Sequence, residues 1–514
     1  MLTAIGSLDV DGNFRIPKFP PEGLARDRRI CRADVSKRNE PIFFGIEAED
    51  ADKFLREKLH ILVKETIGET AVSLLYRDVG YIACRGDKAF SEFRQQEAIE
   101  DFRAARIYLS EFPESDDRTR TEIILRMKEA TPLLENSGYL SIELEELLAP
   151  VINQSIQIKW FEMLARASFD LSVHYAVTGQ IHRSLDVAEK AYEQLYQSEA
   201  IGLRIIAIRT VTTPLLLLGE FVRAKALLKE IVQLGESLKT ISQHSNPLLD
   251  SFVLDLIVTA KSFLSLVSWI LGYPDQAVRL STEAINAADA LEGRNGPNTV
   301  CHVRCFAGAQ LAEFLHNYAQ VKLHAVKALE IGERHNLTNW EGHANMVKGW
   351  ALCKLGEDVV LGQTMLEIRI QRSFNNAGGL YHLAHYLMLD ADIYLGTGSL
   401  DRAEEMLLEA EKQALKAGER YWLSEVYRTM GELCNRQGRL ELAEKRFVQA
   451  INIALEQSAV SFELRAVMGL ARLWRNLDKV RQARCKLKQV LSKFTEGFET
   501  PDLADAMALL AQLK

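Results

Sequence analysis

Apolar positions along the chain repeat with the spacing of helices, most regularly near the C-terminus, where the step is 40 residues. Ala403, Ala443 and Ala483 occupy one position of this repeat, and a large apolar residue follows four places after each. A third apolar residue comes three places later in every copy. Because i, i+4 and i+7 lie on one face of a helix, each copy is expected to bury that face. A chance run of amphipathic helices does not account for a register without gaps over three copies.

Short turns separate the predicted helices. They are centred on Gly179, Gly219, Gly272, Gly356, Gly398 and Gly438, with Asn317 and Asp478 in the same place in two further copies. Gly, Asn and Asp tolerate the left-handed backbone with which a helix ends. Two helices per unit with a period of roughly 34 to 47 residues are the signature of an α-solenoid. The predicted fold class is therefore all-α, a tetratricopeptide-like α-solenoid that forms a right-handed superhelix of about ten helix pairs.

These patterns divide the chain into three parts. The helical repeat array is expected over residues 55–500, and Pro501 in a first turn predicts a capping helix over residues 501–514. Residues 1–54 are richer in proline and lack helical periodicity. Within them, Leu8–Pro17 alternates around an Asp-Gly pair, which predicts a tight hairpin, with an unfolded tail as the alternative.

Upstream of residue 150 the copies of the repeat are looser. Helices are predicted over Phe93–Leu109 and Thr119–Leu134, with the acidic segment Glu111–Asp117 as the loop between them. The segment Leu59–Arg85 is expected to form a helical pair with a turn near Gly68.

Composition narrows the functional classes. The chain has 514 residues, 47% of them hydrophobic, and a net charge of -8, which argues against nucleic-acid binding and leaves only a local basic patch as the alternative. Its most apolar stretch, Leu248–Leu271, is interrupted by three charged residues, so a buried helix pair is predicted rather than a membrane span. The seven scattered cysteines and a start without an export signal predict a cytoplasmic protein.

The sequence offers little for catalysis. It contains no phosphate loop of the form G-x-x-x-x-G-K-[ST] and no nucleophile-elbow pattern. Cys301, His302 and Cys305 lie on one predicted helix, but a structural zinc site needs four ligands and no second ligand pair is evident. These thiols are predicted to be core residues. We therefore expect no enzymatic activity, no cofactor and no bound metal.

One further set of residues could hold a metal. His382 and His385 stand three apart on a predicted first helix, and Glu425 takes the position of His385 in the next copy, so His385 and Glu425 are expected to be neighbours. Two histidines and a carboxylate suit a metal with open positions. The favoured alternative is a structural polar network between adjacent helices. Its members would be Glu425, Arg428, Glu432 and Arg465.

From Leu59 onward the chain resembles the tetratricopeptide half of large bacterial signalling proteins. The matching phrases are EAIEDFRAA from Glu97, LGYPDQA from Leu271, KGWALCKLGE from Lys348, LSEVYRTMGEL from Leu423, ELRAVMGLARLWR from Glu463 and FTEGFETPDL from Phe494. The proteins it resembles are adenylate or guanylate cyclase-like proteins and predicted ATPases of the signal-transduction NTPase class. In these, a cyclase or DNA-binding domain and an NTPase precede the repeats. Residues 1–57 are too short for an NTPase or a cyclase domain, so the resemblance implies the regulatory part alone.

The predicted function is that of a non-catalytic interaction and regulatory module in bacterial signal transduction. Stacked helix pairs form a concave groove that suits an extended peptide or a partner helix. The candidate groove residues are Trp350, Tyr381, His385, Glu425 and Arg428. A protein or peptide partner is expected, with a cyclase or NTPase signalling domain implied by the resemblance. The alternatives are a sensor of a small ligand and a residual cyclase or ATPase activity.

Overall fold

The computed structural model describes residues 7–8, 14–15, 69–241, 246–291, 295–374, 380 and 382–513. The chain divides into two compact units, Met1–Pro113 and Glu114–Lys514. Within the described residues, no helix is long and apolar enough to span a lipid bilayer.

The first unit contains a short hairpin and one helix pair. Strands β1 (Ser7–Leu8) and β2 (Phe14–Arg15) pair in antiparallel fashion, with Leu8 opposite Phe14, in agreement with the hairpin expected from the sequence. Helices α2 (Glu69–Ser91) and α3 (Gln95–Leu109) pack together, and Phe102 of α3 fills the space above Gly86. The expected turn near Gly68 and the array's expected start at residue 55 lie outside the described residues.

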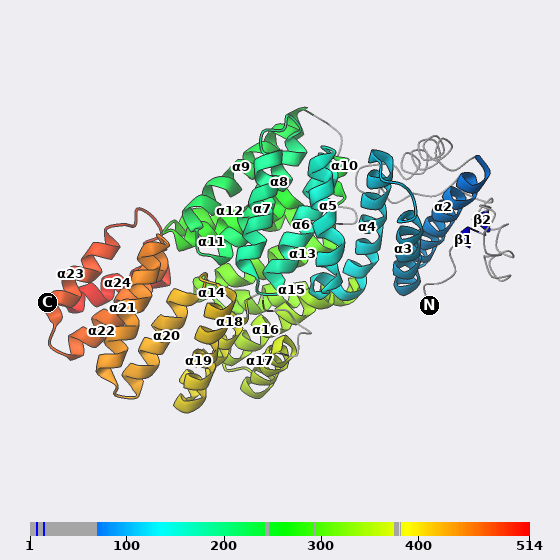
Figure 1. Ribbon diagram of the computed structural model, residues 1–514. Coiled ribbons are helices and arrows are strands. Elements are labelled where there is room, and N and C mark those ends of the chain that lie inside the picture. Colours follow the sequence, from blue (N-terminus) through cyan, green and yellow to red (C-terminus); the bar gives the residue numbers. More distant parts are fainter. Residues whose placement is uncertain are drawn as a thin grey trace. The chain divides into compact units, whose positions relative to one another are not determined.

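The second unit is a stack of antiparallel helix pairs (Figure 1). Its first pairs are α4 (Asp116–Ser137) with α5 (Glu143–Gln157), α6 (Phe161–Val177) with α7 (Ile181–Leu195), and α8 (Ile201–Leu217) with α9 (Phe221–Ile241). The short α10 (Pro247–Asp250) then precedes α11 (Leu256–Ile270) with α12 (Pro274–Asp289), and α13 (Gly296–Val303) and α14 (Leu311–Phe314) together pair with α15 (Tyr318–His335).

The remaining pairs follow without interruption. They are α16 (Thr338–Leu355) with α17 (Val359–Phe374), α18 (Leu383–Thr397) with α19 (Leu400–Ala417), α20 (Leu423–Arg436) with α21 (Leu440–Glu456), and α22 (Val460–Asn476) with α23 (Val480–Leu491). The last helix, α24 (Pro501–Gln512), packs on α22 and α23. The described residues thus contain one pair in the first unit and nine in the second, which confirms the predicted all-α tetratricopeptide-like solenoid.

The two helices of a pair are buried to different extents, and the sequence explains the difference. In α19 only Ala403, Leu407, Ala410 and Ala414 are buried, which is the single apolar face that the repeat predicted. In α18, by contrast, nearly every residue is buried. The first helix of each pair from α6 onward belongs to a set that we call the first helices: α6, α8, α11, α13–α14, α16, α18, α20 and α22. Successive first helices contact one another and form an inner layer. The second helices (α7, α9, α12, α15, α17, α19, α21 and α23) cover it on one side.

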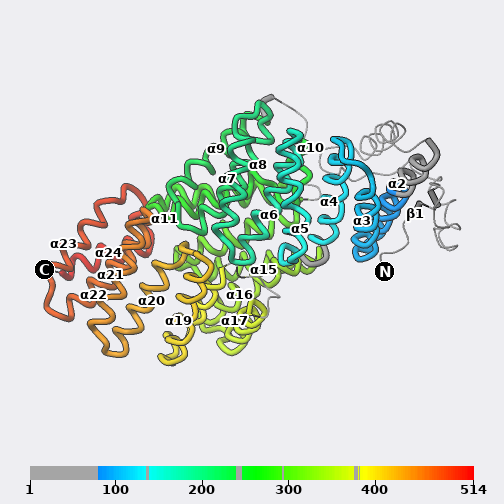
Figure 2. The backbone as a smooth tube through the Cα atoms, in the orientation of Figure 1, coloured from blue at the N-terminus to red at the C-terminus, as the bar shows by residue number. Residues whose placement is uncertain are grey.

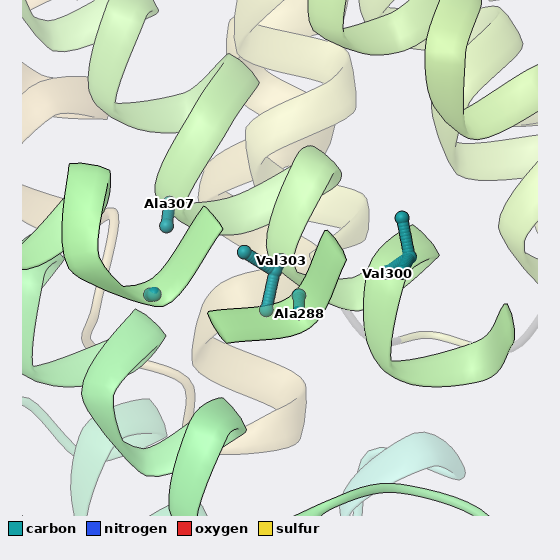
Figure 3. Packing of buried hydrophobic residues seen from close by; sticks show 5 residues of the cluster. Ala288, Val300, Val303 and Ala307 are labelled. Atoms are coloured by element: carbon teal, nitrogen blue, oxygen red, sulfur yellow. The ribbon is translucent and has the colours of Figure 1, made fainter. Parts of the chain in front are cut away.

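The helix that begins at Gly296 contains an irregularity that the periodicity did not predict. Between α13 and α14, the segment η3 (Arg304–Gln310) is a π-helix, which accommodates one extra residue per turn. Its residue Ala307 still packs with Val300 and Val303 of α13 against the alanines of α12 (Figure 3). The widened turn changes the direction in which the following side chains point, and Phe306 and Gln310 both reach the interior of the molecule.

Two element boundaries also differ from expectation for local reasons. Helix α4 begins at Asp116, inside the expected acidic loop, because the Ser115 side chain accepts a hydrogen bond from the Arg118 amide (3.1 Å). Asp116 and Asp117 then face the positive end of the helix dipole. The apolar stretch from Leu248 is not a helix pair but the four-residue α10 followed by α11, whose N-terminus Asp255 caps.

Early and late repeats of the second unit pack against each other. Ser461 of α22 donates a hydrogen bond to the Trp269 carbonyl of α11 (2.5 Å), and the Arg420 amide donates to the Leu217 carbonyl of α8 (2.7 Å). In Figure 2 the tube around α11 runs beside the segment that contains α21 and α22. We call the contacts between residues 177–316 and residues 380–502 the seam. It means that the superhelix closes on itself and fills much of its own interior.

Candidate functional site

Aromatic and imidazole rings gather where the early and late repeats meet. The imidazole of His385 stacks on the indole of Trp422 with a centroid distance of 3.8 Å, and Trp269 stacks on Phe314 at 4.2 Å. Further buried rings in contact with these are His302, Phe306, His343, His382, Tyr386, Tyr421 and Phe462. We call this group the ring cluster. Its members come from helices that are far apart in sequence, so it forms the hydrophobic centre of the seam.

Burial keeps several imidazoles of the ring cluster neutral. It lowers the pKa of His343 to about 3, and it lowers the pKa values of His302 and His382 well below their ordinary value. His302 has no hydrogen-bond partner on either ring nitrogen and is surrounded by the rings of Phe263, Phe306 and Trp340. These histidines act as packing groups in an apolar environment, which the sequence alone did not indicate.

His385 has a carboxylate partner, but it is not the one expected. Its Nε2 lies 2.9 Å from Oε1 of Glu313, which belongs to α14 and precedes it by 72 residues. Glu425 instead contacts two arginines. Among the residues that the structure describes, no three His, Cys, Asp or Glu side chains come together as metal ligands would. Cys301 and Cys305 are fully buried, as core thiols were predicted to be.

A small cavity borders the ring cluster. Its walls are Leu216, Leu217, Phe263, Leu266, Val267, Phe306, Gln310, His382 and Tyr421. Gln310 of η3 donates a hydrogen bond to the Tyr421 hydroxyl (3.2 Å) across the seam. The cavity measures about 10 Å³, which is room for no more than one water molecule. It is a packing defect at the junction of α8, α11 and η3 rather than a ligand pocket.

Charged side chains form a continuous network beside the ring cluster. Arg428 donates to Glu425 (2.9 Å) and Glu432 (2.7 Å), while Arg465 contacts Glu425 (3.3 Å) and Asp502 (2.8 Å). This network joins α20, α22 and the capping helix α24. It confirms the polar network that was the favoured prediction for Glu425, Arg428, Glu432 and Arg465.

A second polar group extends the network toward α16. Trp350 donates from its indole nitrogen to Asp392 (3.1 Å), and Lys354 donates to the same carboxylate (2.9 Å). The ring of Tyr318 stands edge-on to Trp350 at 5.3 Å. Burial acts to lower the pKa of Lys354, but Asp392 and Glu432 act in the opposite direction and the net shift is upward. Lys354 of the second polar group is therefore stabilised in its charged form by Glu432 of the charged network as well as by Asp392.

Together these side chains form a band that we call the polar strip, in which Arg428, Arg465 and Asp502 are largely buried and the other charged members are more exposed. Its members are His316, Tyr318, Lys354, Asp392, Arg428, Glu432, Arg465 and Asp502. Asp392 and Glu432 keep 36% and 39% of their side-chain surface exposed. They occupy the same position in successive repeats, one 40-residue step apart. The strip crosses α16, α18, α20, α22 and α24, so one ligand could touch several repeats at once.

The predicted groove residues fall into different environments. Trp350, His385 and Glu425 are buried against the chain's own side chains, Arg428 is partly exposed, and Tyr381 lies outside the described residues. Their part in ligand binding stays a prediction. Sequence reasoning placed Glu432 in the polar network but missed Asp392, although a carboxylate at the same position one 40-residue step earlier was the signal that could have identified it.

The tetratricopeptide repeat family matches residues 387–456, which span α18 to α21 apart from the first four residues of α18. No curated protein matches the chain in sequence.

Three solved structures are similar to parts of this chain. Aspartyl phosphate phosphatase F from Bacillus subtilis is 14% identical, with 65% of this chain and 94% of that one covered and a TM-score of 0.42. The apo quorum sensor NprR from B. thuringiensis is 11% identical, with 73% and 99% covered and a TM-score of 0.43. A signal transduction ATPase with a tetratricopeptide repeat sensor from Pyrococcus horikoshii is 14% identical, with 90% and 68% covered and a TM-score of 0.35. At TM-scores below 0.5 these likenesses carry no inference about a ligand.

Proposed function

We propose that this chain is a non-catalytic interaction and regulatory module that binds a protein or peptide partner along the polar strip. The observation that carries the proposal is the placement of partly exposed charged side chains on three consecutive first helices: Lys354 on α16, Asp392 on α18 and Glu432 on α20 keep 28%, 36% and 39% of their side-chain surface exposed. Cations and anions alternate along it, which suits a partner with complementary charges rather than a uniformly charged one. Tyr318 adds an aromatic side chain of the kind that anchors interfaces.

The environment of the histidines supports the absence of catalysis. His302, His343 and His382 are enclosed by other rings, so a substrate could not reach them without unfolding the seam. A general base needs to contact the proton that it removes. We expect no turnover when the purified chain is incubated with ATP and Mg²⁺, and product formation above a buffer control would contradict this part of the proposal.

Charge reversal within the polar strip tests the binding site. The purified chain is immobilised, the proteins that it retains are quantified by mass spectrometry, and the strongest is titrated against wild type and Glu432→Lys. Glu432→Lys places a cation beside Arg428 at a half-exposed position, so binding is expected to weaken at least tenfold. The matched control is Glu330→Lys at an exposed position of α15. Equal binding by both variants, or no specific partner at all, would contradict the proposed site.

The partner class follows from the sequence resemblance and is part of the proposal. We propose that the partner is a bacterial cyclase or NTPase signalling domain and that the complex forms in the cytoplasm. In the described part of the chain the cysteines are free thiols, which supports a reducing compartment. Co-expression with such domains encoded beside this gene tests the assignment. The expected result is co-purification that Glu432→Lys abolishes.

A further inference from the structure

Exposed apolar residues recur on the outer surface of three successive second helices. Ile368 of α17, Leu408 of α19 and Val448 of α21 are separated by steps of 40 residues, and each is substantially exposed. Leu415 and Leu455, which lie seven residues (two helical turns) after Leu408 and Val448, form a second row. One 40-residue step further on, the corresponding residues are Lys488 of α23 and Thr495, which follows the end of α23, so both rows end there. This surface shares no residue with the polar strip, and no member of the strip lies on α17, α19 or α21.

The outer face of α19 has an ordered distribution of charge around its leucines. Asp401 and Glu405 lie in its N-terminal half, Lys412 and Lys416 lie in its C-terminal half, and Leu408 stands between the two pairs. All five are exposed, and Leu408 and Leu415 keep 50% and 59% of their surface accessible. The spacings place every one of these residues within a single stripe, because they follow the helical period on the face opposite Ala403, Leu407, Ala410 and Ala414.

This stripe is complementary to a reversed copy of itself. When two α19 helices lie antiparallel about an axis that passes between Leu408 and Glu409, Glu405 of each faces Lys412 of the other. Asp401 of each then faces Lys416 in the same way. A two-fold axis requires such self-complementarity, because each contact is made twice. The antiparallel arrangement also opposes the two helix dipoles favourably.

We propose that a second copy of this chain docks on the α19 stripe, forming a symmetric dimer in which α19 packs antiparallel against its equivalent. Leu408 supplies the apolar centre, with Ile368 and Val448 beside it on the neighbouring second helices. Four charge pairs across the axis set the register. Within one chain Glu405 already contacts Arg402, and Lys412 contacts Glu409, but these are exposed pairs between neighbours on the same helix and compete weakly.

A second copy explains these features better than another partner does. A ligand of uniform charge would meet repulsion from one half of the stripe, and a purely apolar one would leave both charged halves without partners. Within the stripe, the two acidic residues lie three and seven positions before Leu408 and the two lysines lie four and eight positions after it, so the charges are nearly symmetric about Leu408. On α23 the equivalent face carries Arg481 and Lys488 with no acidic residue anywhere in the helix, so the same packing there would be repulsive. The proposed contact is therefore specific to α19.

Complementary charge reversal provides the decisive test. Glu405→Lys and Lys412→Glu are made singly in the full chain, and the mass in solution is followed by sedimentation over a range of protein concentrations. Each variant alone would place like charges opposite one another twice, so dimerisation is expected to weaken at least tenfold. An equimolar mixture restores attraction at all of these contacts, so a dimer containing one chain of each variant is expected. The double variant Glu405→Lys/Lys412→Glu is likewise expected to recover the dimer.

Two further variants separate loss of docking from loss of folding. Leu408→Asp is expected to yield a monomer with an unchanged helical circular dichroism spectrum, because Leu408 points away from the core. Val278→Asp, at a similarly exposed position of α12, is the control and is expected to leave the dimer intact. A wild-type chain that stays monomeric at 100 µM, single variants that dimerise as wild type does, or a mixture that stays monomeric would each overturn the proposal.

Discussion

Phe447 is held between two glycines, and this contact sets the distance between consecutive first helices. A Cβ atom on Gly431 of α20 would lie 2.7 Å from the Phe447 ring, and one on Gly469 of α22 would lie closer still. The sequence showed that the Phe447 position recurs at the 40-residue step. It did not show that the Phe447 ring occupies space left by two glycines on neighbouring helices, because those glycines come together only when the helices pack.

Gly469→Ala is therefore expected to destabilise the protein by about 1–3 kcal/mol through overpacking, despite alanine's better helix propensity. The matched control is Gly396→Ala in α18, where no atom lies within 4 Å of the added Cβ. That substitution is expected to stabilise by about 0.5–1 kcal/mol. Both values are measured by urea unfolding. Adding Phe447→Leu to Gly469→Ala should recover part of the loss, and equal effects of the two glycine substitutions would contradict the packing argument.

Glu419 and Asp390 make stability depend on pH. Burial raises the pKa of Glu419 to about 8, and burial followed by the nearby Glu367 raises the pKa of Asp390 to about 7. Oε1 of Glu419 has no hydrogen-bond partner. Unfolding returns these pKa values to about 4.5 and 3.8. Between the unfolded and the folded pKa values, the folded state binds a proton that the unfolded state does not. The contribution of each protonated carboxyl to the free energy of unfolding is therefore fully present at low pH and is lost as pH rises toward 8.

The expected slope is at most about 1.4 kcal/mol per pH unit for each group. Thermal unfolding midpoints of wild type and Glu419→Gln, measured from pH 5 to pH 8.5, test this. The amide cannot ionise, so the variant's midpoint should fall less steeply with pH than that of wild type. Glu330→Gln, at an exposed position, serves as the control. Parallel curves for Glu419→Gln and wild type would show that Glu419 does not titrate in this range.

At the scale of single elements, the sequence predicted the helices that bury one face and missed those that depend on distant contacts. Helices α18 to α24 were expected because their apolar spacing and turn residues agree at every copy. The π-helical segment η3 was not, because its extra residue per turn has no local signal and is stabilised by packing against α11, α12 and α15. The predicted polar network was correct, whereas the partner of His385 was not, since Glu313 belongs to another part of the stack.

The capping helix α24 offers a prediction at this scale. Leu503 is buried against α22 and α23, whereas Met507, four residues later, is exposed. Leu503→Ala is expected to lower the unfolding free energy by about 2–4 kcal/mol and to speed hydrogen exchange in α22 and α23. Met507→Ala should change neither by more than about 0.5 kcal/mol. If Leu503→Ala left exchange in α22 and α23 unchanged, α24 would not act as a cap.

At the scale of the whole second unit, the repeat predicted the stack but not its closure. The contacts that a periodic pattern encodes are those between neighbouring repeats. Whether the superhelix returns to meet itself depends on small rotations that add up over many pairs. The seam, the ring cluster and the Glu313–His385 contact all result from that return. Because these contacts join distant repeats, the second unit is expected to unfold cooperatively rather than one repeat at a time.

Two turn glycines with the same backbone conformation test this cooperativity. Gly219 and Gly398 have φ values of 77° and 81°, so alanine is strained at both by about 1–2 kcal/mol. A Cβ added at Gly219 would collide with Gln457 across the seam, whereas at Gly398 no atom lies within 4 Å of the added Cβ. Gly398→Ala should therefore keep a single unfolding transition. Gly219→Ala should lose more stability, and hydrogen exchange should quicken in both α8 and α21, which only the seam connects. Exchange that quickens in α8 alone would contradict a seam that couples early and late repeats.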